Sequence, residues 1–223
     1  MSASATSTLL VADRVKPLLR GVSHQIAFYL SLVAGAALTA LASSGVPTWC
    51  ALVYSICLAA LFGISSAYHR PNWSPNARQW MRRLDHAGIF LMIAGTYTPV
   101  CLLAVKGETG EHLLIAVWIG AALGCIKSVV WVNAPKALFA LLCVIYAWAV
   151  LGQWSAVHAG IGDRGAWLLL GGGASYTVGA VIYALKRPDP FPATFGYHEI
   201  FHALVIAGAV CHFFIVTALV LPA

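Results

Sequence analysis

Long apolar stretches alternate with short polar connections along the whole chain. Each stretch is about 20 residues long, which is the length that a helix needs to cross roughly 30 Å of membrane hydrocarbon. The connections carry turn residues, as in Ser44-Gly45-Val46-Pro47. The pattern predicts seven transmembrane helices, over about residues 22–43, 48–68, 83–105, 112–132, 136–157, 165–186 and 197–220.

The composition supports a membrane-embedded fold. Of the 223 residues, 61% are hydrophobic and only 9% are charged, whereas a soluble globular chain carries about 25% charged residues. No connection is long enough to form a second domain, so we expect a single domain over residues 1–223. The expected fold is therefore all-α, a polytopic membrane protein built as a seven-transmembrane helix bundle.

Positive charge is distributed unevenly between the two sides of this predicted bundle. The N-terminal tail and every second connection share one side, and eleven of the 13 Lys and Arg residues fall there, leaving only Lys106 and Arg164 on the other. Because cytoplasmic loops are enriched in Lys and Arg, we expect a cytoplasmic N-terminal tail (residues 1–21) and an external C-terminus. The basic residues are scattered over short loops, so the net charge of +6 indicates attraction to an anionic inner leaflet and not nucleic-acid binding.

Four ionisable residues meet at one depth on the cytoplasmic side of this topology. His69 ends the second span, Asp85 opens the third, and His198 and His202 lie in the first turns of the seventh. Residues four apart lie on one face of a helix, about 6 Å apart along its axis, which suits two ligands of one ion. Ionisable side chains inside a membrane are costly without a partner, and a divalent cation would satisfy all four. Taken singly, each could instead be an interfacial or structural residue.

Three neutral imidazoles with one open position are typical of a catalytic zinc site, although ligand type alone also admits iron, nickel or copper. Asp85 could be a fourth ligand that closes the site, or it could hydrogen-bond a metal-bound water as a base. Ser65 lies one turn before His69 on the same face, where its hydroxyl could steady a ligand or a substrate oxyanion. The sequence thus predicts His69, His198 and His202 as metal ligands, and Asp85 and Ser65 as catalytic residues.

The segment His198-Glu199-Ile200-Phe201-His202 also spells HExxH, the zinc-protease helix signature in which the Glu is the general base. On a helix Glu199 is rotated by about 100° from His198, so its carboxylate need not face the metal. Soluble zinc proteases do not place this motif in a seventh apolar span. An intramembrane metalloprotease stays open as a less favoured alternative.

Three motifs fall in the second, third and seventh predicted spans: Ser65-Ser66-Ala67-Tyr68-His69, Leu84-Asp85-His86-Ala87-Gly88-Ile89, and His198-Glu199-Ile200-Phe201-His202 with Cys211-His212-Phe213. Together they resemble the bacterial hemolysin III proteins, within the progestin and adipoQ receptor (PAQR) group of seven-span membrane proteins. The resemblance implies a cytoplasmic N-terminus, a bacterial inner-membrane location, and a zinc site near the cytoplasmic face. It also implies that His69, His198 and His202 are the zinc ligands, and that Asp85 holds the zinc-bound water. Related receptors are similar to lipid-amide hydrolases of the ceramidase type, whereas the hemolysin name implies cytolysis.

Two main classes of function follow from these observations. The favoured one is a zinc-dependent hydrolase of a lipid amide or ester at the inner leaflet, in which Asp85 shuttles the proton. The alternative is a non-enzymatic membrane protein with a structural zinc, acting as a sensor, in membrane homeostasis, or as a cytolytic, permeabilising factor. In both, the expected cofactor is Zn²⁺ and the expected partners are membrane lipids.

Overall fold

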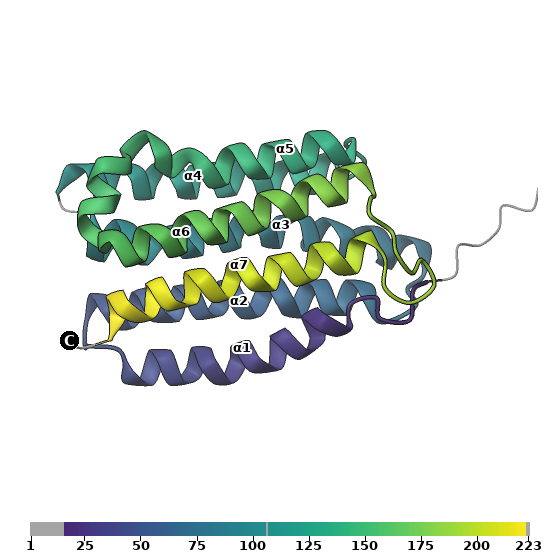
Figure 1. The fold of residues 1–223 in the computed structure, drawn as a ribbon, viewed down its shortest axis with the longest axis horizontal. Helices are drawn as coiled ribbons and strands as arrows, with labels where there is room; N and C mark the ends of the chain where they lie inside the picture. Colours follow the sequence, from purple (N-terminus) through teal and green to yellow (C-terminus); the bar gives the residue numbers. More distant parts are fainter. Residues whose placement is uncertain (1–15, 106, 222–223) are drawn as a thin grey trace, which may run out of the picture.

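The computed structural model describes residues 16–105 and 107–221, and within them every regular element is a helix (Figure 1). A π-helical turn, Val100–Ala104, extends the third helix, and a 3₁₀ segment, Trp148–Gln153, joins the fifth helix to the sixth. The predicted all-α fold is confirmed. The α-helices are α1 (Val22–Leu41), α2 (Val46–His69), α3 (Pro75–Pro99), α4 (Glu108–Val130), α5 (Lys136–Ala147), α6 (Trp154–Leu185) and α7 (Tyr197–Val220).

Six helical stretches of the described residues are long and apolar enough to cross a membrane. Five of them correspond to α1, α2, α3 with its π-helical turn, α4 and α7, while the sixth runs over 50 residues as Lys136–Leu185. That stretch contains Gly162, whose φ of 66° and ψ of 179° are not helical. The ribbon doubles back within this stretch (Figure 1), and Gly162 lies where the sequence predicts the connection between the fifth and sixth spans. Residues 1–15 of the predicted tail, and Lys106, lie outside the described residues.

The start of α3 differs from the predicted span, because the helix begins at Pro75 and the span was expected at residue 83. Hydrophobicity marks where a helix enters the membrane, whereas helix formation follows backbone preferences. Proline is favoured at the first helical position, and Arg78 and Arg82 continue the helix outside the apolar stretch. At the other end, Pro99 cannot donate a backbone hydrogen bond, and α3 passes there into the π-helical turn.

Helix α7 lies between α6 on one side and the α1–α2 pair on the other (Figure 1). Small residues bring α6 and α7 close together: a side chain at Gly179 would approach the Phe201 ring to 3.2 Å, and one at Gly208 would approach Tyr176 to 2.8 Å. Close backbone approach at small residues is how helices associate in membranes. Large apolar side chains such as Val33 and Trp167 remain exposed on the outside, as expected for a surface that faces lipid.

The segment before α1 covers the end of the bundle at which α2 finishes and α7 starts. The amides of Leu18 and Leu19 donate to the carbonyls of Ala193 and Thr194, at 3.0 and 3.1 Å, in the connection before α7. Lys16 Nζ donates to the carbonyl of Arg70 at 2.6 Å. These contacts bring residues far apart in sequence over one end of the helices, and the candidate site lies directly beneath.

Candidate metal centre

The structure brings together the three histidines that the sequence predicts as ligands. His69 is the last residue of α2, and His198 and His202 lie in the first turns of α7. One ligand nitrogen from each falls within 4.8 Å of the others, and all three side chains are buried. The prediction that these three histidines from distant segments come together is therefore confirmed.

The spacing of the nitrogens fits a single ion. His69 Nε2 and His198 Nε2 are 3.1 Å apart. Two ligands of one tetrahedral zinc ion, each bonded at about 2.0–2.1 Å, lie roughly 3.3 Å from each other. His202 Nδ1 is buried and has no hydrogen-bond partner within the described part of the chain, and a buried imidazole nitrogen is costly in that state. The group could hold a metal ion.

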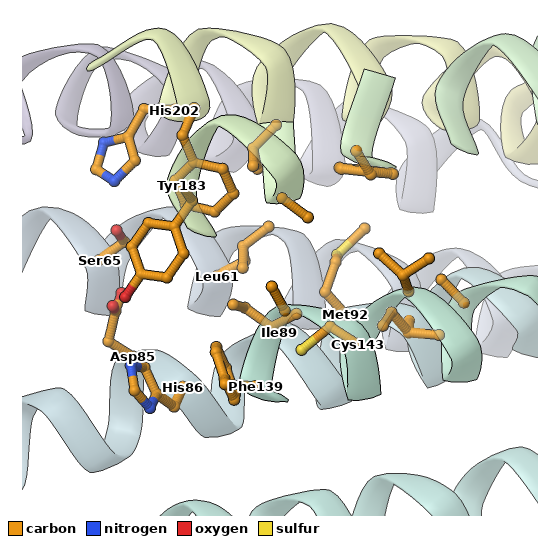
Figure 2. Close-up of a pocket in the computed structure, with 18 of the residues that line it drawn as sticks. Leu61, Ser65, Asp85, His86, Ile89, Met92, Phe139, Cys143, Tyr183 and His202 are labelled. Carbon is orange, nitrogen blue, oxygen red and sulfur yellow. The ribbon is translucent and has the colours of Figure 1, made fainter. Parts of the chain in front are cut away.

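Asp85 lies beside the histidine group but does not belong to it. Its Oδ2 is 4.0 Å from His69 Nε2, but Asp85 is not one of the residues whose ligand atoms all lie within 4.8 Å of one another. Ser65 and Asp85 both line the cavity described below, and Ser65 is almost completely buried. The two residues predicted as catalytic therefore lie at the same end of the cavity as His202 (Figure 2).

Glu199 of the HExxH motif is engaged elsewhere. Its Oε2 accepts a hydrogen bond of 2.8 Å from the Gly196 amide at the start of α7, and its Oε1 accepts from Arg20 Nε. Only 2% of the Glu199 side chain is exposed, against 21% for Arg20. This carboxylate caps the helix and pairs with the segment before α1. A buried carboxylate requires such a cation. Glu199 in an apolar segment was therefore a signal for a cationic partner, and the pairing with Arg20 was not predicted.

Two further side chains belong to the site and were not predicted. His24 of α1 stacks on His202, with ring centroids 3.8 Å apart and an angle of 7° between the planes. Figure 2 shows the Tyr183 ring from α6 with its hydroxyl turned toward Asp85. Neither residue lies in a motif, and only the packing of α1 and α6 against α7 brings them here. His212, the deeper histidine of α7, instead lies with Nε2 3.4 Å from the carbonyl of Leu169.

A cavity of about 480 Å³ connects the histidine group with the interior of the bundle. At one end it is lined by Ser65, Asp85 and His202, together with the other site residues. Farther along the lining becomes apolar (Figure 2), with Leu61, Ile89, Met92, Phe139 and Cys143. The cavity is therefore amphipathic, with its polar end at the histidines.

Comparison with known proteins agrees with these motifs. The family of haemolysin-III-related proteins matches residues 12–213. This chain belongs to the hemolysin III family. Hemolysin-3 of Bacillus cereus is 32% identical over 170 residues, which cover 76% of this chain and 74% of that protein. The Hemolysin-3 homolog of Bacillus subtilis is 28% identical over 198 residues, covering 87% and 90%.

A relative from outside bacteria supports the place of this chain in the wider PAQR group. The Heptahelical transmembrane protein ADIPOR2 of rice is 28% identical over 196 residues, covering 78% of this chain and 83% of that protein. Together with the six apolar helical stretches, the family membership identifies an integral, multi-pass membrane protein.

Proposed function

We propose that this hemolysin III protein is a zinc-dependent hydrolase that cleaves an amide or ester of a lipid at the inner leaflet of the bacterial membrane. The observation that carries the proposal is the position of the three-histidine group at the polar end of an amphipathic cavity, with Asp85 4.0 Å from one ligand nitrogen. A lipid has the matching shape, because its scissile group lies between a polar head and an apolar chain.

The proposed topology has seven spans with the N-terminus in the cytoplasm. Three observations support it: the ribbon doubles back within the 50-residue stretch Lys136–Leu185 (Figure 1), eleven of the 13 Lys and Arg residues fall on one side, and the rice relative carries the name heptahelical. The histidine group then lies at the cytoplasmic end, at the depth of lipid head groups.

The residues of the chain divide the chemistry between them. His69, His198 and His202 would hold the ion, and imidazole nitrogen is a preferred ligand of zinc. The chemistry that zinc supplies at such a site is polarisation of a carbonyl and acidification of water. Asp85 would take up a proton from water and return it to the leaving group. Ser65 lines the cavity beside Asp85 and would help to orient its carboxylate.

The apolar lining of the cavity would hold the hydrocarbon chain of the substrate. Leu61, Ile89, Met92 and Phe139 lie along it beyond Asp85 (Figure 2). The chain of a membrane lipid already lies in hydrocarbon, so its transfer to this lining gains little hydrophobic free energy. The lining would instead orient the lipid, because its polar head fits only the end of the cavity at the histidines.

The alternatives fit the same geometry less well. A purely structural zinc would be closed by Asp85 as a fourth ligand, but Asp85 is not among the residues whose ligand atoms all lie within 4.8 Å of one another. A protease would need Glu199 as its base, and both oxygens of Glu199 already accept hydrogen bonds from Gly196 and Arg20.

The test is turnover of a panel of fluorescent lipid amides and esters by the purified protein, beside Asp85→Asn. This change keeps the size of the side chain but removes the base. We expect Asp85→Asn to keep about one zinc per chain and to lose roughly 10²- to 10⁴-fold in turnover, the usual contribution of general acid–base catalysis. Equal turnover by Asp85→Asn would show that Asp85 is not the base, and no turnover of any lipid by the unmutated, zinc-loaded protein would refute the hydrolase.

A further inference from the structure

Four cationic side chains line the same cavity at its polar end. Arg20 precedes α1, Arg78 and Arg82 lie on α3, and Lys136 is the first residue of α5. Arg78 and Arg82 are four residues apart, and Asp85 follows three residues later, so all three share one face of α3. The cations therefore come from three separate segments that the fold gathers around one space.

The positive charge of this group is largely uncompensated. Asp85 is the only carboxylate among the cavity-lining residues that the structure describes. Arg20 is paired with Glu199, whereas Arg78, Arg82 and Lys136 have no carboxylate within 4.0 Å in the described ranges 16–105 and 107–221. Three cations and one carboxylate leave a net positive charge at the polar end of the cavity.

The partners that hold these three cations are neutral. Lys136 Nζ donates to the Tyr197 hydroxyl at 3.3 Å and lies 4.6 Å from the centre of the Tyr183 ring. Arg82 Nη1 donates to Asn133 Oδ1 at 3.2 Å, and the Arg78 guanidinium lies 5.5 Å from the Tyr68 ring. Such contacts orient a cation without cancelling its charge, and they leave N–H groups available to another acceptor.

The general enrichment of cytoplasmic loops in Lys and Arg does not explain this placement. Arg70 directly follows α2 and Arg83 lies on α3, close in sequence to Arg78 and Arg82, yet neither Arg70 nor Arg83 lines the cavity. Arg83 is instead held by the Val129 carbonyl at 3.0 Å and lies 4.4 Å from the Trp80 ring. Arg83 therefore provides a matched control, next in sequence to Arg82 but outside the group.

We infer that the polar end of the cavity binds the phosphate of a phosphorylated lipid headgroup, while the apolar end holds its chain. Guanidinium and ammonium groups from separate segments are the usual donors to phosphate oxygens. The inference rests on the proposed function for the presence of a lipid in the cavity, and it narrows the substrate class to phosphate-bearing lipids. It concerns binding and not the cleavage step.

The test measures binding, so that it is independent of turnover. Short-chain phosphatidic acid, diacylglycerol with the same chains, and inorganic phosphate would be titrated against the purified protein in neutral detergent. We expect phosphatidic acid to bind at least tenfold more tightly than diacylglycerol, and inorganic phosphate to bind far more weakly than the lipid. Equal affinities for the two lipids would overturn the inference, and inorganic phosphate binding as tightly as phosphatidic acid would overturn its lipid part.

Variants locate the effect within the cavity. Lys136→Gln and Arg82→Gln should each weaken phosphatidic acid binding about fivefold or more, because each removes a charge-assisted hydrogen bond, and should leave diacylglycerol binding unchanged. Lys136→Arg, which keeps the charge, should bind within about twofold of the unmutated protein, as should the control Arg83→Gln. An equal loss in Arg83→Gln would indicate a diffuse surface effect and contradict the inference.

The two proposals can fail separately. If phosphatidic acid binds as expected but no lipid amide or ester is cleaved, the hydrolase is refuted and the headgroup site stands. If neutral lipids are cleaved and phosphate confers no advantage in binding, the hydrolase stands and the headgroup site is refuted.

Discussion

The ion pair between Arg20 and Glu199 should stabilise the fold without contributing to metal binding, and neutral substitutions at each position test this directly. In Arg20→Gln the Glu199 carboxylate, 2% exposed, keeps its bond to the Gly196 amide but loses its counter-charge. Removal of one partner from a buried pair costs about 3–5 kcal/mol. Arg20 is 21% exposed, so water already screens part of the interaction and we expect the lower end, roughly 3 kcal/mol.

The reverse change, Glu199→Gln, should cost less. Gln can still accept the hydrogen bond from the Gly196 amide, as it does in a capping box, and the stranded Arg20 can turn toward water. We expect about 1–2 kcal/mol, and the double variant should be close to Glu199→Gln alone. A chain of this size loses about 2–4 °C in melting temperature for each kcal/mol, so Arg20→Gln should melt roughly 6–12 °C lower.

A thiol-reactive dye gives a suitable assay, because Cys50, Cys57 and Cys101 are free and buried in the folded protein. Dye reaction on heating would be followed for the four proteins of the cycle, beside metal content. A purely stabilising role for the ion pair is contradicted if Glu199→Gln melts normally yet loses its metal or its turnover. That result would make Glu199 a residue of the metal centre and revive the protease.

Two other changes probe the surroundings of the ligands. His24→Ala removes the ring stacked on His202 and should weaken zinc affinity about 10- to 100-fold, the usual effect of losing an orienting neighbour. His24→Phe keeps a ring and should keep most of the affinity. Chelator competition measures the zinc affinity of both variants, and equal affinities in all three proteins would mean that the stack does not affect zinc binding. Gly21→Ala places a methyl group 2.7 Å from His69 Cβ at a φ of +78°, and should lower both melting temperature and zinc affinity. Gly45→Ala is the matched control, since its φ is +88° with nothing within 4 Å, and it should lower melting temperature alone; unchanged zinc affinity in Gly21→Ala would separate that glycine from the site.

The helices and the meeting of the three histidines could be predicted from the sequence because both depend on strong local patterns. Stretches of about 20 apolar residues mark spans, and the spacing of His198 and His202 fixes a common face. Alternation of direction from span to span then brings His69 to the same end. The start of α3 was displaced because Arg78 and Arg82 are good helix formers that hydropathy excludes from a span.

The rest of the site depends on packing that no local pattern encodes. Nothing around His24 indicates that α1 will bring its ring parallel to His202. Tyr183 approaches Asp85 only because α6 packs closely against α7 at small residues. The group of Arg78, Arg82 and Lys136 could not be predicted from a local pattern either. Lys136 is more than 50 residues from the two arginines in sequence, and the three side chains come together only at the cavity.

We propose that the three histidines hold a catalytic zinc ion. The most direct test is the elemental metal content of the detergent-purified protein, beside His202→Ala and Asp85→Ala. We expect about one zinc per chain in the unmutated protein, loss of the zinc in His202→Ala, and retention in Asp85→Ala, because Asp85 lies outside the three nitrogens. Loss in both variants would indicate a closed four-ligand site with a structural role, and no metal in the unmutated protein would contradict the account.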